Sequence, residues 1–282
     1  MQTPLFVHSG TPVTGRDFAN ALSSLGIRAG STLFVHSGLQ AFGKLPAGMT
    51  REPLCLTLID VLLRAVGKNG TVVMPTFNYA FCRGVPFNVQ KTPSEVGTLS
   101  EFFRGERHVV RSKHPIFSVA AYGKRARDLT AVNMDSFGPG TFFANFLEAG
   151  GTFIFMGGAT FCNSCTFIHQ IERTHGVPYR FTKRFKGTLI DGRKRKIVEA
   201  THFVRPLRST RDIDYSRLEK RLIRKKMLAT EKVGAACICA VSAKNLFREG
   251  MQILDTDIYS LTKKTPLTVR FDTTAAMGLS SP

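Results

Sequence analysis

The chain is poor in acidic residues and has no long apolar run. Its 282 residues hold 20 aspartates and glutamates against 39 lysines and arginines, a formal net charge of +19 with a pI near 10.1. No uninterrupted apolar stretch reaches the roughly 20 residues that a bilayer-spanning helix needs, and no basic stretch followed by an apolar run opens the chain. We therefore expect a cytoplasmic protein without a membrane span. Tryptophan is also absent, which decides nothing about function.

Cysteines are few, and their spacing does not suggest a disulfide framework. The chain has six, mostly in apolar surroundings: Cys55, Cys82, Cys162, Cys165, Cys237 and Cys239. Scattered apolar cysteines are typical of reduced thiols. A P-loop and a dinucleotide-binding fingerprint are missing too, since the glycine-rich turn at 136–141 matches neither pattern. ATP hydrolysis and NAD chemistry are therefore not leading interpretations.

The excess of positive charge predicts attraction to something anionic, such as nucleic acid, an acidic membrane face or a polyphosphate cofactor. Much of it lies between residues 183 and 226. Asp191-Gly192 is a tight-turn dipeptide between two strand-like segments, 187–190 and 197–200, so the basic run 193–196 is expected at a hairpin tip. A nucleic-acid-binding protein is the rival interpretation from another class, but no recognisable module supports it, and we expect no specific nucleic-acid partner.

The first third of the chain alternates helices and strands. Apolar periodicity predicts helices at 16–25 and 53–66 and strands at 31–36 and 70–75, a pattern typical of a parallel crossover. Further predicted elements are a helix at 96–103, strands at 109–118, 119–122 and 152–156, a helix at 142–149, a hairpin at 186–203, a basic helix at 215–227, a strand at 235–240 and a helix at 243–254. We predict an α/β (α+β) fold with a mixed, partly parallel central sheet flanked by helices. It forms a single domain over 1–265 with a basic hairpin and helix region at about 183–226, followed by a loose tail at 266–282.

Polar residues follow the predicted strands. In open α/β sheets ligands bind beyond the carboxyl ends of strands, so Ser37, Thr76 and Thr160 are candidate cavity-lining residues. Arginine and serine donors around the segment 109–118 suit anionic oxygens. The alternative is a surface strand with an incidental basic patch.

The most informative segment is 157–172, where a hydrophobic strand runs into a glycine turn and a polar helix start. Thr166, His169 and Glu172 recur at intervals of three, so on a helix they would form a row along one side. A hydroxyl, an imidazole and a carboxylate together suit acid/base chemistry. On this segment alone, a histidine with a purely structural role is the favoured interpretation.

Two other interpretations of the same segment are weaker. The segment and the residues just after it supply four possible soft ligands for zinc: Cys162, Cys165, His169 and His175. Structural zinc sites, however, usually join ligand pairs from separate hairpins or helices. A CxxC redox pair normally opens a helix in a thioredoxin-like unit and has proline or glycine between its cysteines. Asn163 and Ser164 do not fit that pattern, and we expect no metal.

Taken in order along the chain, six motifs resemble the aminoglycoside 3-N-acetyltransferase family, whose fold differs from that of the common GNAT acetyltransferases. They are Leu33–Ser37, Gly70–Thr76, Thr92–Gly97, Arg111–Pro115, Phe137-Gly138 and Thr166–Glu172. The resemblance covers roughly residues 10 to 250. It implies an acyltransferase that moves an acetyl group from acetyl-CoA, its co-substrate, to an amine.

Carried over residue by residue, the resemblance implies that His169 accepts a proton as the amine attacks the thioester. Glu172, or an acid elsewhere in the chain, would orient the ring, and Thr166 or a backbone amide would stabilise the oxyanion or the leaving thiolate. Direct transfer of the acetyl group from coenzyme A to the amine is favoured. A covalent acyl-enzyme on the thiol of Cys162 or Cys165 is the alternative. The residues at positions that surround the coenzyme are His36, Ser37, Thr76, Arg111, Ser112 and Ser118. The oligomeric state is not determined by the sequence, and a homodimer is one possibility.

The chain departs from the family pattern at two positions. Cys165 precedes Thr166 where relatives usually have asparagine, and Gly38 replaces a second serine after the His-Ser pair. The second change removes a hydroxyl for one coenzyme hydrogen bond. The family's downstream acidic motif is not clearly matched either, so a second catalytic acid is not identified.

The charge balance guides the choice of acceptor. Aminoglycosides are polycations, and an enzyme that binds them should line its cleft with carboxylates. Twenty acids against 39 bases instead favour an anionic acceptor. We therefore predict N-acetylation of an amino sugar that is nucleotide-linked or a glycan intermediate; the alternative is an aminoglycoside 3-N-acetyltransferase that confers antibiotic resistance.

Overall fold

A computed structural model describes residues 3–206 and 212–263. The strands are β1 (Pro4–His8), β2 (Thr11–Thr14), β3 (Thr32–Gly38), β4 (Thr71–Pro75), β5 (Phe87–Asn88), β6 (Val110–Arg111), β7 (Val119–Gly123), β8 (Thr152–Gly157), β9 (Phe181–Asp191), β10 (Lys194–Val204), β11 (Leu228–Val233) and β12 (Ala236–Ser242). The α-helices are α1 (Gly15–Ser24), α2 (Arg51–Val66), α3 (Thr98–Gly105), α4 (Ala126–Thr130), α5 (Phe142–Glu148), α6 (Phe161–Ser164), α7 (Ile168–His175), α8 (Ser216–Arg224) and α9 (Ala243–Thr256). Two short 3-10 helices are η1 (Leu39–Phe42) and η2 (Ala80–Arg83). The predicted tail at 266–282 lies outside the described residues.

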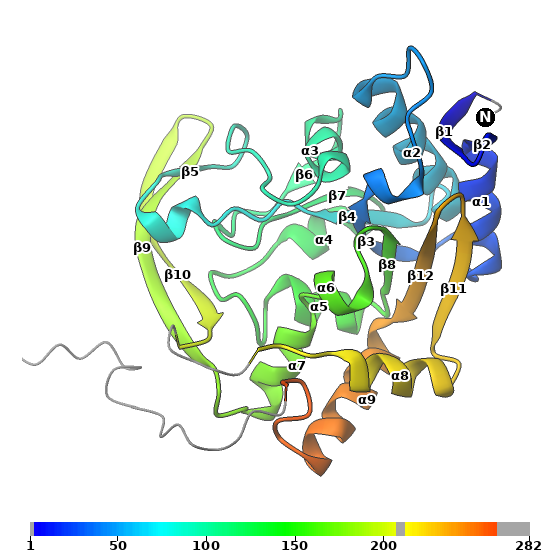
Figure 1. The fold of residues 1–282 in the computed structure, drawn as a ribbon. Coiled ribbons are helices and arrows are strands. Elements are labelled where there is room, and N and C mark those ends of the chain that lie inside the picture. Colours follow the sequence, from blue (N-terminus) through cyan, green and yellow to red (C-terminus); the bar gives the residue numbers. More distant parts are fainter. Residues whose placement is uncertain (1–2, 207–211, 264–282) are drawn as a thin grey trace, which may run out of the picture.

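A seven-stranded mixed sheet forms the centre of the fold, in the order β11-β12-β8-β3-β4-β7-β6 (Figure 1). Strand β3 runs parallel to both β4 and β8, and the other neighbours in the sheet are antiparallel. The predicted crossover through α2 is therefore confirmed. In the described part of the chain no helix is long and apolar enough to cross a bilayer.

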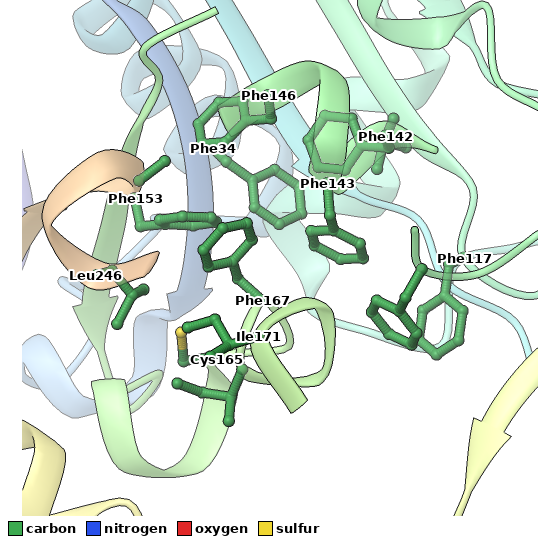
Figure 2. Close-up of a cluster of buried hydrophobic side chains, with 14 of the residues drawn as sticks. Phe34, Phe117, Phe142, Phe143, Phe146, Phe153, Cys165, Phe167, Ile171 and Leu246 are labelled. Carbon is green, nitrogen blue, oxygen red and sulfur yellow. The ribbon is translucent and has the colours of Figure 1, made fainter. Parts of the chain in front are cut away.

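Alternating side chains of the central strands fill two separate cores, one on each face of the sheet. Phe34 of β3 and Phe153 of β8 point to one face, whereas Leu33 and Ile154 point to the other. The first core is rich in phenylalanine and includes side chains from α5, α7 and α9; Figure 2 shows Phe142, Phe143, Phe146, Phe167, Ile171 and Leu246 in one cluster with Phe34 and Phe153. The second core packs against α1, α2 and α3. Because both faces are covered, β3, β4 and β8 read as nearly continuous apolar runs.

The predicted basic hairpin is confirmed and is longer than the sequence indicated. Strands β9 and β10 pair antiparallel from Phe181 and Val204 to Asp191 and Lys194, so Gly192 and Arg193 form a two-residue loop. With β5 they make a second sheet, beside the central one (Figure 1). Strand β11, between the basic helix and β12, was not predicted.

The segment 109–118 was predicted as one strand, which is wrong beyond its start. Only β6, at Val110–Arg111, is extended and paired. His114 explains the break, because its Nδ1 accepts hydrogen bonds from the backbone N–H groups of Ile116 (3.2 Å) and Phe117 (2.9 Å). A side chain that binds the backbone two and three residues ahead folds it into a turn.

A buried glutamate joins α8 to α9. Glu249 of α9 is 1% exposed and receives Arg221 Nε at 2.6 Å, Lys225 Nζ at 2.8 Å and Arg248 Nε at 3.3 Å. Burial alone would raise the pKa of Glu249, but the hydrogen bonds from these three cations outweigh it and lower the pKa to about 2. The carboxylate is therefore ionised throughout the neutral range.

Replacing Glu249 by glutamine is expected to lower the free energy of unfolding by about 2 kcal/mol near pH 7, because three cations lose their charged acceptor. A group whose folded pKa is depressed stabilises the fold above its unfolded pKa of about 4.3, and this contribution disappears as pH falls through about 2. Urea unfolding at several pH values measures both effects. An equal loss of stability at pH 7 and at pH 2.5 would contradict the prediction.

Candidate active site

The segment 157–172 leads from the end of β8 in the central sheet to α7, which packs in the phenylalanine-rich core. Strand β8 ends at Gly157, α6 follows with a capping box between Thr160 and Asn163, and α7 begins at Ile168. Thr166 therefore lies before the helix, and the predicted helical row of three residues holds only for His169 and Glu172. Thr166 remains close in the backbone, since its carbonyl accepts the N–H of His169 at 3.0 Å.

His169 and Glu172 form a direct pair on one side of α7. His169 Nδ1 lies 2.7 Å from Glu172 Oε2, and the glutamate side chain is fully buried while that of the histidine is 18% exposed. The hydroxyl of Tyr179 donates to Glu172 Oε1 at 3.0 Å, and Arg180 Nε lies 2.7 Å from Oε2 as an ion pair without hydrogen-bond alignment. The carboxylate thus contacts three side chains: the imidazole of His169, the phenol of Tyr179 and the guanidinium of Arg180.

Sequence reasoning missed Tyr179 and Arg180 as members of the site. A left-handed Gly176 (φ +83°) ends α7, and the N–H groups of Gly176 and Val177 both return to the carbonyl of Glu172, at 3.0 and 3.2 Å. This turn reverses the chain and places the next residues against the helix. The glycine was the one sequence signal for the turn, and nothing in the sequence indicated which side chains it would bring back.

The charges around the pair fix the protonation of His169. Burial raises the pKa of Glu172, but contact with His169, Arg180 and Tyr179 outweighs it and holds the pKa below its usual value. Burial and the positive charge of Arg180 lower the pKa of His169, against the opposing effect of Glu172. At neutral pH the carboxylate is ionised and can only accept, so the imidazole proton resides on Nδ1. Nε2 then carries a lone pair, as a general base requires.

Aromatic rings cover the histidine. The ring of Phe137 meets the His169 ring edge to face at 5.6 Å, and Phe117 lies 5.2 Å from Phe137. His202 of β10 packs against Phe117 at 4.9 Å, which brings the basic hairpin into the site. Burial, together with the charges of His169, Arg180 and His114, lowers the pKa of His202 to about 3, so this ring is neutral at pH 7. His202 was not predicted, because only the tertiary packing of the hairpin places it here.

Three of the predicted coenzyme-binding residues meet at the carboxyl end of β4. Thr76 Oγ1 and Ser118 Oγ lie 3.0 Å apart, and Arg111 Nε donates to both, at 3.1 and 3.2 Å. Arg111 also donates from Nη2 to the carbonyl of Thr76 at 2.8 Å and from Nη1 to the carbonyl of Val89 at 3.2 Å. Its donors are therefore largely used inside the protein, which favours a positioning role for the guanidinium.

In the described structure, the side chains of the other three predicted coenzyme-binding residues form no hydrogen bond with this cluster. His36 of β3 is buried and stacks on Phe155 at 5.3 Å, and burial lowers its pKa to about 3, so it offers no positive charge to a phosphate. Ser37 is half-buried beside Gly97, the residue that precedes α3. Ser112 is buried and accepts the N–H of Val119 at 2.9 Å. Coenzyme binding by these residues stays a prediction, as do the roles of Thr166, His169 and Glu172.

A hollow of about 450 Å³ lies beside His169 and shares Phe137 with it. Among the described residues, hydroxyl and carboxylate side chains dominate its polar lining: Asp135, Ser136, Glu148, Thr174, Thr182 and Thr201, with Gln170 and one cation, Arg173. The local balance of charge is therefore acidic, although the chain as a whole is strongly basic.

Comparison with known proteins decides the family. The family model for aminoglycoside 3-N-acetyltransferase matches residues 34–255. The chain belongs to this acetyltransferase family. The predicted family, the acyltransferase class and the use of acetyl-CoA by that class are thereby confirmed.

Curated relatives and solved structures agree with the family model. Aminoglycoside N(3)-acetyltransferase VIII of Streptomyces fradiae is 26% identical over 290 residues, which cover 89% of this chain and 95% of that protein. Aminoglycoside N(3)-acetyltransferase IV of a Salmonella species is 30% identical over 162 residues, 56% of this chain and 58% of that protein. The solved structure of AAC-IIIb in a binary complex with CoASH superposes with a TM-score of 0.74 at 23% identity, over 90% of this chain and 99% of that one. The predicted fold class is confirmed.

Gly38, one of the two departures from the acetyltransferase family pattern, has a steric reason. A Cβ atom at this position would lie 2.7 Å from the backbone nitrogen of Ala159 and 2.8 Å from Gly158 Cα. Strand β3 and the loop after β8 approach closely here, and the N–H of Gly158 donates to the carbonyl of Gly38 at 2.8 Å. A serine at this position would displace the loop that leads to Thr166 and His169.

Replacing Gly38 by alanine is therefore expected to lower the free energy of unfolding by about 1 to 3 kcal/mol, as overpacking against rigid backbone does. Thermal unfolding followed by circular dichroism measures the change. Gly105→Ala is the control, because this glycine has open space around it and no left-handed φ. A Gly38→Ala protein as stable as the wild type would show that the loop after β8 adjusts freely.

Cys162 and Cys165, the two cysteines near His169 in the sequence of this acetyltransferase, are poorly suited to nucleophilic chemistry. Burial, with the hydrogen bond to Glu219, raises the pKa of Cys162 to about 12, and burial also raises the pKa of Cys165. A thiol that stays protonated at neutral pH is a weak nucleophile. Among the described residues, no group of three or more histidines, cysteines or carboxylates is arranged to hold a metal ion.

Proposed function

We propose that this protein transfers the acetyl group of acetyl-CoA to a primary amine of an aminoglycoside, with His169 as the general base. The observation that carries the proposal is the His169–Glu172 pair, with a 2.7 Å contact to a buried carboxylate, in a chain of the aminoglycoside 3-N-acetyltransferase family. The pair leaves His169 Nε2 with a lone pair at a partly exposed position. The family and the names of its relatives favour the amine at position 3 of the acceptor.

The reaction follows from this arrangement in one transfer step through a tetrahedral intermediate. The acceptor nitrogen attacks the thioester carbonyl, and His169 Nε2 takes the proton that the nitrogen loses as the C–N bond forms. Ionised Glu172 stabilises the resulting imidazolium and keeps its orientation. The C–S bond then breaks, the acetyl group stays on nitrogen, and the thiolate of coenzyme A recovers the proton from His169. Thr166, next to the start of α7, is the proposed donor to the oxyanion.

The donor side of the site is proposed at the carboxyl ends of β3 and β4. Ser37 lies beside the start of α3, and the amino end of a helix attracts phosphate oxygens. Thr76 and Ser118 would contact the coenzyme while Arg111 holds them in position. A row of rings, Phe117 to Phe137 to His169, connects this region with the general base.

The hollow beside Phe137 is the proposed acceptor site. Its carboxylates, Asp135 and Glu148, suit an amine-bearing acceptor, and its hydroxyl groups suit a sugar. This local charge favours the aminoglycoside over the anionic amino sugar that the total charge predicted. Whole-chain charge is a poor guide to one cleft, because charges more than about 10 Å away are screened in salt.

A nucleotide-linked or glycan amino sugar is the second candidate acceptor. The observation in its favour is the excess of 39 basic over 20 acidic residues. Basic residues also belong to or adjoin the site: Arg173 on α7, Arg180 after that helix, and Lys183 next to the lining residue Thr182 on β9.

A thiol-release assay with acetyl-CoA separates the two candidates. Acceptors are a panel of aminoglycosides and a panel of nucleotide-linked amino sugars, each tested with wild type and with Asp135→Asn. We expect turnover of an aminoglycoside, with a higher KM in the Asp135→Asn variant. Turnover confined to the nucleotide sugars would make them the acceptor in place of the aminoglycoside, with the same acetyl-transfer reaction. No thiol release with any acceptor would overturn the proposed function.

A further inference from the structure

A second and larger hollow lies at the opposite end of the central sheet from Thr76. Its volume is about 850 Å³, within the usual range for small-molecule sites. The lining comes from the end of α2, the turn before β4, the segment that enters β6, the end of β7 and the start of α4. Thr76 follows the carboxyl end of β4, whereas Gly70 of this lining precedes its amino end. The whole length of β4 thus separates the two regions.

The walls of this hollow are strongly basic. Its charged lining residues are Asp60, Arg64, Lys68, Lys124 and Arg127. Asp60 is the one carboxylate among them, and Arg64 Nε already pairs with it at 2.6 Å. Within residues 3–206 and 212–263, Lys68, Lys124 and Arg127 form no ion pair. Three cations around one hollow, with no carboxylate partner among the described residues, produce a positive potential that attracts anions.

The backbone that carries these cations is held in place. Gly123 at the end of β7 has φ +120°, and a Cβ on it would lie 2.2 Å from the carbonyl oxygen of Gly70. Past this contact, the N–H of Lys124 donates to Gly70 at 3.0 Å and the N–H of Arg125 donates to Thr71 Oγ1 at 2.9 Å. The backbone that carries Lys124 and Arg127 is therefore constrained before a ligand binds, which lowers the entropy cost of binding.

The lining also includes a tyrosine ring, besides the imidazole of His108. Tyr122 of β7 is among the few exposed large hydrophobic side chains of the described chain, at 38% exposure. An exposed ring beside several cations matches a ligand that has both a flat ring and phosphate groups. We propose that this hollow binds a nucleotide, with the phosphates on Lys68, Lys124 and Arg127 and the base on Tyr122. The nucleotide is either free or part of a single-stranded nucleic acid.

The test measures binding of fluorescently labelled ATP to the full chain by anisotropy, at roughly 0.15 M salt, where nonspecific attraction is screened. We expect the double variant Lys124→Glu with Arg127→Glu to weaken ATP binding about 30-fold or more, because two charge-assisted contacts become repulsive. The matched control is Arg193→Glu with Lys194→Glu at the hairpin tip, which changes the net charge by the same amount. It should change ATP affinity by less than about twofold, since neither Arg193 nor Lys194 lines the hollow and attraction from charges outside it is screened in salt.

Two further measurements separate the ring from the phosphates and this hollow from the active site. Tyr122→Leu should weaken binding of ATP but not of inorganic triphosphate. The KM for acetyl-CoA should be unchanged in the Lys124 and Arg127 variant, which also reports correct folding. A single-stranded thymidine oligonucleotide that binds far more tightly than ATP, with the same sensitivity to that variant, would assign the nucleotide to a nucleic acid.

The remaining outcomes overturn the proposal. If both double variants weakened ATP binding equally, the binding would be explained by long-range charge attraction and not by contacts in this hollow. ATP binding that neither variant changes would locate the nucleotide elsewhere, and no ATP or oligonucleotide binding would leave the hollow without this ligand. If Tyr122→Leu weakened triphosphate as much as ATP, the base contact would be absent and the ligand would not be a nucleotide.

Discussion

Replacing His169 by alanine is expected to lower kcat for acetyl transfer by about 10³-fold, within the range that general-base catalysis contributes. The physical reason is the lone pair on Nε2, which the Glu172 contact of 2.7 Å at Nδ1 secures. No other described histidine has this arrangement with a buried carboxylate. The KM for acetyl-CoA should change by less than about threefold, because the ring acts on the amine proton and not on the coenzyme. Steady-state thiol release measures both constants.

His175→Ala is the matched control for this prediction. His175 lies on the same helix and also contacts a carboxylate, Asp255 at 3.1 Å, but that carboxylate is exposed. We expect the control to keep kcat within about twofold of wild type. A His169→Ala enzyme with near wild-type kcat would exclude His169 as the base, and equal losses in both variants would point to damage to α7 instead.

Replacing Glu172 by glutamine should be the next most damaging change, with kcat lowered by about 10²-fold. Glutamine keeps the size of the side chain but removes the charge that orients His169 and stabilises its protonated form. It also leaves Arg180, whose side chain is 6% exposed, without its buried counter-charge. We therefore expect a lower free energy of unfolding as well, by about 3 kcal/mol.

The pH dependence separates the catalytic effect of Glu172 from its structural effect. Burial and Arg180 lower the pKa of His169, whereas Glu172 raises it. Without the carboxylate the pKa of His169 falls further, so the acidic limb of kcat/KM should move to lower pH in Glu172→Gln. Arg180→Met should move the same limb to higher pH, because it removes a repulsive positive charge. If the acidic limbs of kcat/KM in Glu172→Gln and Arg180→Met did not move in opposite directions, the proposed electrostatic effects of Glu172 and Arg180 on His169 would be wrong.

Glu249→Gln serves as the control for stability in this experiment. Like Glu172, Glu249 is buried and held by cations, but it joins α8 to α9 and does not contact His169. It should reduce stability while leaving kcat and the pH profile unchanged at a temperature well below unfolding. A comparable loss of kcat in Glu249→Gln would mean that stability alone explains the result for Glu172→Gln.

Much of the fold was determined by local sequence. The apolar runs at β3, β4 and β8 predicted the central strands because strands covered on both faces carry no polar alternation. The stops at Gly26 and Gly67 and the turn at Asp191-Gly192 marked element boundaries, since glycine tolerates the left-handed backbone found at Gly26, Gly67 and Gly192. The spacing of three between His169 and Glu172 was enough to predict their contact, because the geometry of one helical turn fixes it.

Only the tertiary structure decided the rest, because those contacts join residues whose sequence separation carries no periodic signal. The chain reversal at Gly176 brought Tyr179 and Arg180 to Glu172, and the packing of β10 brought His202 to Phe117. Tertiary packing also showed why position 38 is glycine and why Arg111 holds Thr76 and Ser118. Composition fixed the total charge of +19, but folding distributed it. Carboxylates lie in the hollow beside Phe137 and several cations line the hollow at the other end of the sheet. A ligand responds mainly to the charge within a screening length of it.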